Sequence, residues 1–248
     1  MASYVFDKSD GSINFDGTKI YIDVGDNVER LRENDDVLLM HKSPPYIDVY
    51  KALGTRLNIL ELGILRGGST PFIHRLLEPR KLVCIDLCAP VPALDRYVAD
   101  HGNGIIAPYY HVDQGDKNAL ADIIEKEFDG PIDLIVDDAS HFYRESKASF
   151  EAVFPFLKTG GTFLLEDWSW SHGPGADQPD HYAYDRGALT SLLFELIAAM
   201  GTHAPLFIEE MYILHFLARF RKGQIQLPKR GFLLDNYMQL RGKSMLPL

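Results

Sequence analysis

Two short acidic clusters contain the residues best suited to chemistry. One is Val136-Asp137-Asp138-Ala139-Ser140-His141 and the other is Leu165-Glu166-Asp167-Trp168. Each follows an apolar run of the kind that forms a buried strand. If the two strands are neighbours, about 5 Å apart, Asp138 and Asp167 project into the same cleft.

Two carboxylates this close repel each other unless a proton, a cationic side chain or a metal lies between them. Neither cluster contains Lys or Arg. The expected partner of Asp138 and Asp167 is therefore a hard divalent cation bound through oxygen, Mg²⁺ first. The alternative is that Asp138 or Ser140 caps the next helix and Asp167 faces solvent.

His141 follows Asp138 by three positions, close enough to act on whatever the cation holds. Imidazole can accept a proton at cellular pH, which makes His141 the candidate general base. The alternative is a plain surface histidine in a loop.

A third candidate is the glycine-rich turn in Leu57-Asn58-Ile59-Leu60-Glu61-Leu62-Gly63-Ile64-Leu65-Arg66-Gly67-Gly68-Ser69-Thr70. The pattern predicts a strand, a tight turn and a helix capped by Ser69 or Thr70. Glycines let the backbone approach a ligand, and the helix start offers free N–H groups. The spacing differs from the G-x-G-x-x-G of dinucleotide sites. A plain connection without a ligand is the alternative.

Three polar residues fall at the ends of later strands, where ligands bind in parallel sheets. Asp86 closes the second core strand and suits the hydroxyls of a ribose, with a solvated aspartate as the alternative. Asp113 and Gln114 follow the third strand, where an adenine amino group could be read. Asp113 and Gln114 could equally be ordinary loop residues without a ligand.

Residues 168–185 form the longest loop-like segment, and loops this long tend to be lids or disordered. Flat aromatic rings among polar groups suit the apolar face and hydroxyl edge of a sugar. Rings that simply anchor the loop to the sheet are as good an explanation. The segment contains Trp168, Trp170, His172, His181, Tyr182 and Tyr184.

The elements that must position these residues alternate along the chain. Such alternation predicts a doubly wound, Rossmann-like α/β fold, with helices on both faces of a mostly parallel seven-stranded sheet whose last strand is antiparallel. The expected strands are residues 57–62, 81–86, 105–112, 132–137 and 161–166, followed by 206–210 and 212–220. The expected helices are residues 69–78, 92–101, 116–127, 143–157 and 186–200.

Residues 1–45 are expected to form a short N-terminal cap, and residues 46–248 the main domain with its lid at 168–185. Asp16-Gly17 signals a hairpin within an irregular segment, and residues 26–42 look helical. Pro44-Pro45 is expected to stop that helix, and a short helix should follow at 46–53.

Composition excludes some partners. The net charge of −10 argues against nucleic acid or an anionic membrane surface, and no apolar stretch is a membrane span. In a strand, Cys84 and Cys88 would lie about 13 Å apart, too far for a disulfide. With no signal peptide at the N-terminus, we expect free thiols and a cytoplasmic location. Whether the chain forms a homodimer is left open.

Taken together, these motifs resemble class I S-adenosylmethionine-dependent methyltransferases. Within that class the chain is similar to the metal-dependent sugar O-methyltransferases of macrolide biosynthesis (the mycinamicin VI type) and to bacterial enzymes that methylate mannosides or rhamnosides. The resemblance covers about 57–167, and the large N-terminal domain of the macrolide enzymes is missing. The matching residues are Glu61, Gly63, Gly67, Gly68, Ser69, Asp86, the segment Asp137 to His141, Gly160, Gly161, Glu166 and Asp167.

The resemblance implies that Asp138 and Asp167 bind Mg²⁺ and that His141 deprotonates the acceptor hydroxyl of a sugar or glycoside. It assigns no third protein ligand. It also implies S-adenosylmethionine as the cofactor. The implied cofactor-binding residues are Glu61, Gly63, Gly67, Ser69, Asp86, Asp113, Gln114 and Asp137.

Two other functions stay open. One is another enzyme on the same cofactor fold, such as an aminopropyl transferase or a hydroxylase-like relative. The other is a non-catalytic S-adenosylmethionine-binding protein, which would not need Asp138, His141 and Asp167 together.

Overall fold

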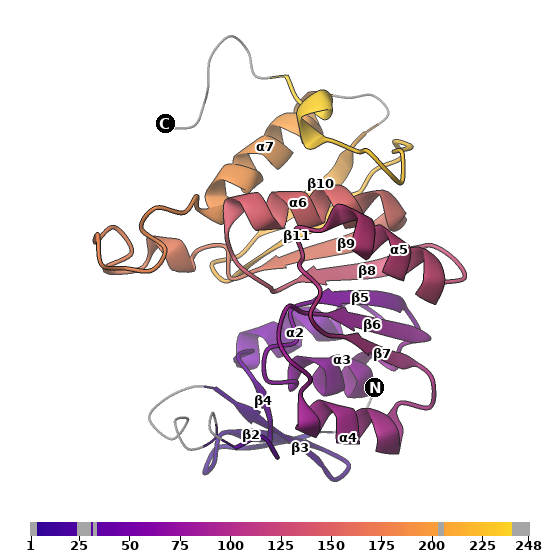
Figure 1. The fold of residues 1–248 in the computed structure, drawn as a ribbon, viewed down its shortest axis with the longest axis vertical. Helices are drawn as coiled ribbons and strands as arrows, with labels where there is room; N and C mark the ends of the chain where they lie inside the picture. Colours follow the sequence, from indigo (N-terminus) through magenta and orange to yellow (C-terminus); the bar gives the residue numbers. More distant parts are fainter. Residues whose placement is uncertain (1–3, 24–30, 32–33, 203–205, 240–248) are drawn as a thin grey trace. The chain divides into compact units, whose positions relative to one another are not determined.

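The structure, a computed structural model, describes residues 4–23, 31, 34–202 and 206–239 (Figure 1). The chain divides into two compact units, Met1–Val112 and Asp113–Leu248. Within the described residues, no helix is long and apolar enough to cross a membrane.

The first unit begins with a small four-stranded sheet. Its strands follow the order β1 (Val5–Asp7), β2 (Ser12–Phe15), β3 (Thr18–Ile22) and β4 (Leu38–Met40). The predicted hairpin at Asp16-Gly17 is confirmed, since these two residues link β2 to β3 with positive φ angles of 46° and 91°. The Asn14 side-chain oxygen accepts a hydrogen bond from the Gly17 N–H at 2.8 Å and closes the turn.

The helix expected at 26–42 is wrong at its C-terminal end. Leu38–Met40 is β4, which pairs in parallel with β3 and buries Leu39 and Met40. Residues 24–30, 32 and 33 lie outside the described residues. Pro44-Pro45 starts a helix rather than stopping one, because α2 spans Pro44–Lys51. Proline is tolerated in a first helical turn, where its missing N–H would have no partner within the helix.

The rest of the first unit alternates strands and helices as predicted. β5 (Asn58–Leu62), β6 (Lys81–Ile85) and β7 (Ile106–Tyr109) pair in parallel in that order. The connecting helices are α3 (Ser69–Leu77) and α4 (Pro92–His101). The last four residues of β5 and of β6 are all buried, as expected of strands covered on both faces.

The second unit continues the alternation of strands and helices and then ends in antiparallel strands. β8 (Ile132–Asp137) pairs in parallel with β9 (Leu157–Glu166), and the order is β10-β11-β9-β8. Its helices are α5 (Lys117–Glu127), α6 (Tyr143–Val153) and α7 (Leu189–Thr202), with α5 and α6 side by side (Figure 1). Three short 3₁₀ helices complete it: η1 (Phe154–Phe156), η2 (Trp170–His172) and η3 (Leu234–Tyr237).

The predicted strands 206–210 and 212–220 misplace the turn between them. β10 runs Ile208–Ile213 and β11 runs Leu217–Lys222, so residues 211–213 belong to the first strand. The turn is closed by the Leu214 N–H, which donates to the Leu217 carbonyl at 2.8 Å. The last strand, β11, is antiparallel to both β9 and β10, as predicted. Within the described residues, β5 to β11 make up the expected seven-stranded sheet.

Both cysteines are free thiols, as predicted. Burial raises the pKa of Cys84 well above its usual value, with Glu61 adding to the shift. Burial and the nearby Asp86 raise the pKa of Cys88 to about 12. Neither thiol is therefore a thiolate at neutral pH, and neither is a nucleophile.

The glycines of the β5–α3 turn pack against their neighbours within the first unit. Gly68 donates its N–H to the Leu39 carbonyl at 3.0 Å, and Leu39 forms a bridge with Gly67. A Cβ on Gly68 would lie 2.4 Å from the Leu39 carbonyl carbon. The small N-terminal sheet thus presses directly on the turn, and only glycine fits between them.

We therefore expect Gly68→Ala to force the β4 backbone away from the turn. Overpacking of this kind costs about 1–3 kcal/mol, which corresponds to a fall in melting temperature of roughly 2–12 °C for a chain of this size. Thermal unfolding followed by circular dichroism measures it. The control is Gly130→Ala, because a Cβ there meets nothing within 4 Å. Equal melting temperatures for the two variants would contradict the close packing at Gly68.

Candidate active site

The first acidic cluster begins at the end of a fully buried strand. Asp137 is the last residue of β8, and its side chain is buried. Its Oδ2 accepts a hydrogen bond from the Ser149 hydroxyl at 2.6 Å. Burial raises the pKa of Asp137 to about 6, although the Ser149 hydrogen bond lowers it. Asp137 therefore belongs to the interior, and Asp138 is the first residue of the cluster to reach the surface.

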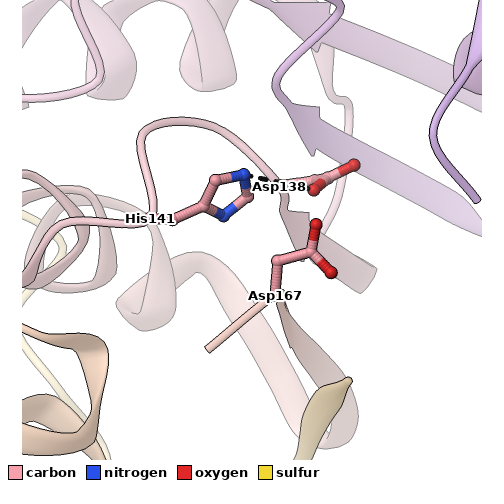
Figure 2. A group of neighbouring side chains, drawn as sticks. All are labelled: Asp138, His141 and Asp167. Carbon is pink, nitrogen blue, oxygen red and sulfur yellow. Dashed lines mark ion pairs between the residues drawn. The ribbon is translucent and has the colours of Figure 1, made fainter. Parts of the chain in front are cut away.

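The second cluster lies beside the first because β8 and β9 are parallel neighbours. Asp137 pairs with Leu165, which brings the residues after both strands to the same edge of the sheet. One ligand-capable atom each from Asp138, His141 and Asp167 lies within 4.8 Å of the others. In Figure 2 the imidazole and the two carboxylates converge from the two strand ends. The predicted convergence of Asp138 and Asp167 is confirmed.

His141 faces Asp138 directly. Its Nε2 lies 3.8 Å from Asp138 Oδ1, and both side chains are about one-fifth exposed, at 22% and 18% (Figure 2). Half-buried groups of this kind can reach a ligand from solvent while keeping a fixed geometry. The arrangement suits an imidazole that receives a proton next to a pair of carboxylates.

Two of the three residues have a strained backbone. His141 has φ of 60° and Asp167 has φ of 53°, in the left-handed region that non-glycine residues seldom adopt. Such a conformation costs of order 1–3 kcal/mol and persists only where neighbours hold it. The Asp167 N–H donates to the Phe216 carbonyl at 2.7 Å, and the Trp168 indole donates to the Leu214 carbonyl at 2.7 Å. The β10–β11 turn therefore holds Asp167 in place.

The donor set fits a divalent cation. Carboxylate oxygens are the ligands that Mg²⁺ and Mn²⁺ prefer, and a neutral imidazole nitrogen is a common ligand of transition metals. Two like charges within 4.8 Å also favour a positive charge between them. Asp138 and Asp167 could hold such a cation, with His141 either as a third ligand or as an adjacent base.

The cofactor residues predicted in the first unit lie around the β5–α3 turn. Glu61 is buried, and its Oε2 accepts a hydrogen bond from the Thr70 hydroxyl at 2.6 Å. The helix cap predicted at Ser69 or Thr70 is wrong, since Gly68 is the N-cap of α3 and no side chain caps it. The Thr70 hydroxyl bonds the buried Glu61 carboxylate rather than capping the helix.

Asp86 lies immediately after β6 and braces the same turn. Its Oδ2 accepts hydrogen bonds from the N–H groups of Ile64 and Leu65 at 2.6 and 2.8 Å. Its Oδ1 accepts one from Cys88 at 2.8 Å. The Cys88 side chain also hydrogen-bonds this carboxylate. Contact of Asp86 with a ribose stays a prediction, and the bracing of the turn is a role that the sequence did not suggest.

Asp113 and Gln114 lie at the start of the second unit. Asp113 is exposed, and its Oδ1 accepts the Gly115 N–H at 2.7 Å in a local turn. Gln114 is half-buried and bonds the loop that carries His141: its Oε1 accepts the Ser140 N–H at 2.9 Å. Contact of either residue with an adenine stays a prediction.

The aromatic residues of 168–185 divide into two groups. Trp168 anchors the segment to the β10–β11 turn, whereas Trp170 stacks on Tyr182 with ring centroids 5.2 Å apart and planes at 11°. Tyr182 is 67% exposed, and the Trp170 ring also meets the His141 ring edge-on at 6.4 Å. Anchoring, one of the two alternatives of the sequence analysis, is confirmed for Trp168, and contact of the other rings with a sugar stays a prediction.

Two residues of this aromatic cluster were not found by sequence reasoning. Phe142 lies next to His141 and meets Trp170 and Tyr182 edge-on. The guanidinium of Arg186 lies 4.3 Å from the centre of the Phe142 ring. The position of Phe142, directly after the candidate base, was the available signal.

Comparison with known proteins identifies the central part of the chain. A family model described as a methyltransferase domain matches residues 60–168. This range contains every predicted site residue, from Glu61 to Asp167, and excludes the N-terminal sheet and most of the aromatic segment.

Two curated relatives are sugar-related O-methyltransferases. One is mycinamicin VI 2''-O-methyltransferase of Micromonospora griseorubida, 28% identical over 125 residues that cover 45% of this chain and 31% of that protein. The other is L-olivosyl-oleandolide 3-O-methyltransferase of Streptomyces antibioticus, 36% identical over 127 residues that cover 49% of this chain and 30% of that protein. The chain thus covers less than a third of the length of either relative.

A solved structure shares the fold. The MycE methyltransferase of the mycinamycin biosynthetic pathway, in complex with Mg, SAH and mycinamycin VI, matches with a TM-score of 0.56 and 24% identity. The match covers 73% of this chain and 48% of that one. The chain therefore has the Rossmann-like α/β fold of these enzymes, and its residues 60–168 match the model of a methyltransferase domain.

Proposed function

We propose that this chain transfers a methyl group from S-adenosylmethionine to a hydroxyl of a sugar or glycoside, with Mg²⁺ as cofactor and His141 as general base. The observation that carries the proposal is the convergence of Asp138, His141 and Asp167 at one edge of a methyltransferase domain. A module that only binds the cofactor would not need an imidazole beside two carboxylates.

Supporting observations come from the relatives. Both curated relatives described above are named as O-methyltransferases, one of mycinamicin VI and one of L-olivosyl-oleandolide, and the MycE structure contains Mg and SAH. Because this chain covers only part of each relative, the substrate and the metal are proposed here on the strength of its own residues.

The cofactor would bind at the β5–α3 turn. Asp86, at the end of β6 beside this turn, would contact a ribose hydroxyl, while Gly63 and Gly67, with φ of 102° and 78°, shape the turn. The sulfonium supplies the methyl group, so the protein has to align the acceptor hydroxyl for in-line attack. The hydroxyl oxygen forms the new bond to carbon, and the cofactor leaves as a thioether.

Asp138 and Asp167 would hold Mg²⁺. When bound, the cation would make a nearby sugar hydroxyl more acidic, as metals do for water. His141 Nε2 then takes the proton of that hydroxyl, and Asp138, 3.8 Å away, stabilises the imidazolium that forms. Glu61 and Asp137 are buried and serve the geometry of the two loops.

Residues 168–185 would act as a lid that carries the acceptor subsite, and residues 1–45 as a cap on the domain formed by 46–248. The exposed face of Tyr182, backed by Trp170, offers a flat surface for a sugar ring. Free thiols and an acidic chain agree with a cytoplasmic enzyme whose substrate is a small glycoside.

Incubation with a labelled methyl donor and a panel of glycosides tests the proposal. We expect label on a sugar hydroxyl, and a rate for His141→Ala that is about 10²–10⁴-fold lower, because a positioned base contributes that much. The control is His215→Ala, an exposed imidazole in the same unit. A His141→Ala rate near that of the control would mean that another group takes the proton, and transfer of an aminopropyl group would identify a different enzyme.

Metal removal should abolish turnover while cofactor binding survives. We expect EDTA to stop methyl transfer and Mg²⁺ to restore it, with unchanged SAH affinity in calorimetry. Asp138→Ala should behave like the chelated enzyme and resist rescue, because one of the two carboxylate ligands is missing. Asp129→Ala removes an exposed aspartate elsewhere and is the control. Full activity of Asp138→Ala in EDTA would rule out the metal.

The exposed face of Tyr182 should matter for the acceptor alone. We expect Tyr182→Ala to raise the KM for the glycoside about 2–10-fold, the effect of losing one stacked ring, and to leave SAH affinity unchanged. Tyr212→Ala, another exposed tyrosine of the same unit, is the control. Equal losses for acceptor and SAH would mean that the aromatic segment is structural.

A further inference from the structure

The loop that carries His141 needs support at its centre. The Tyr143 N–H donates to the Gly187 carbonyl at 2.9 Å, and Phe142 forms an isolated β-bridge with Ala188. These two contacts hold the loop at the start of α6. Asp137, in β8, holds its other end. Between these two ends lies His141, whose φ of 60° is one that a non-glycine residue keeps only under restraint.

Gln114 supplies a restraint at the residue before His141. Its Oε1 accepts the Ser140 N–H at 2.9 Å, so the peptide group that leads into His141 is fixed from outside the loop. At its other end, Gln114 Nε2 donates to the Ser149 hydroxyl oxygen at 3.3 Å. A single side chain from the segment before α5 thereby ties the loop to α6.

The orientation of the Gln114 amide is set by its partners. The buried Ser149 hydroxyl donates to Asp137 Oδ2 at 2.6 Å, so its oxygen is left to accept from Gln114 Nε2. A flipped amide would set its NH₂ group against the Ser140 N–H, donor against donor. The chain of hydrogen bonds therefore runs in one direction, from Gln114 through Ser149 to Asp137.

We propose that Gln114 is a positioning residue for methyl transfer: it holds the Ser140 peptide so that His141 stays within reach of Asp138 and Asp167. The proposal rests on the proposed function in taking His141 as the base. It differs from the adenine contact predicted from the sequence, because both polar ends of the Gln114 amide are engaged within the network of the second unit.

The two roles of Gln114 give opposite outcomes for Gln114→Leu. A positioning residue predicts a kcat that is about 10–100-fold lower, because small misplacements of a catalytic group have effects of this size. It also predicts a Kd for SAH within about twofold of the native value. An adenine contact predicts a weakened Kd for SAH and a nearly unchanged kcat.

Gln114→Glu is the conservative variant. Its carboxylate keeps an acceptor for the Ser140 N–H, so it should recover part of the lost kcat, while its second oxygen competes with Asp137 for the one hydroxyl hydrogen of Ser149. Gln226→Leu makes the same change at an exposed glutamine far along the chain and should leave kcat unchanged. A kcat of Gln114→Glu that is no higher than that of Gln114→Leu would contradict the proposal that Gln114 holds the Ser140 N–H.

Hydrogen exchange followed by mass spectrometry tests, without any measurement of turnover, whether Gln114 holds the Ser140 peptide. In Gln114→Leu, the segment 138–142 should exchange faster than in the native chain, while in Gln226→Leu it should not. Unchanged exchange in 138–142 overturns the proposal, whether or not the chain methylates glycosides. Faster exchange in a chain that shows no methyl transfer would uphold the contact of Gln114 with Ser140 and reject the proposed function instead. Gln114→Ala, which also removes the acceptor for the Ser140 N–H, serves for both measurements if Gln114→Leu does not fold.

Discussion

The repulsion between Asp138 and Asp167 is the constraint on which the candidate site depends. Ligand-capable atoms of the two carboxylates lie within 4.8 Å of one another, a distance at which like charges near a protein surface repel by an energy on the order of a few kcal/mol. The parallel pairing of β8 and β9 brings these residues to one edge of the sheet, so the repulsion between their carboxylates is a direct consequence of the fold. A positive charge between the two carboxylates would reduce the repulsion, and the imidazole of His141 lies within 4.8 Å of both.

Keeping these groups together requires a rigid surrounding. His141 and Asp167 both have left-handed backbones, and each is held by hydrogen bonds from other segments: Asp167 by the β10–β11 turn, and the loop of His141 by Gln114 and Gly187. The same principle applies in the first unit, where Asp86 braces the β5–α3 turn and Leu39 packs on Gly68. Catalytic groups need such pre-organised support, because small misplacements have large effects on rate.

The sequence predicts most of the fold and the site's core because the responsible patterns are local. The buried strand Ile132–Asp137 has the apolar run Leu134-Ile135-Val136 at its centre, and α4 begins at a proline after a loop, so the predicted bounds of both match the structure. Asp138 and Asp167 followed from the rule that residues after neighbouring parallel strands share an edge. The ligand-capable atoms of these residues lie within 4.8 Å of one another, as that rule predicts.

Errors arose where distant contacts decide. Leu38–Met40 is a strand because β3 is available to pair with it, and local periodicity cannot reveal that partner. Thr70 bonds the buried Glu61 instead of capping a helix, and Gln114 bonds Ser140, which lies far along the chain. The aromatic cluster around Phe142 also forms from segments separated in sequence.

Anomalous scattering from crystals grown with Mn²⁺ tests the central claim most directly, because Mn²⁺ shares the preference of Mg²⁺ for carboxylate oxygen and can be located without reference to activity. The account predicts one strong peak bonded to a carboxylate oxygen of Asp138 and one of Asp167, within reach of His141. A peak at another place, or no peak at this pair of aspartates at millimolar Mn²⁺, would contradict it.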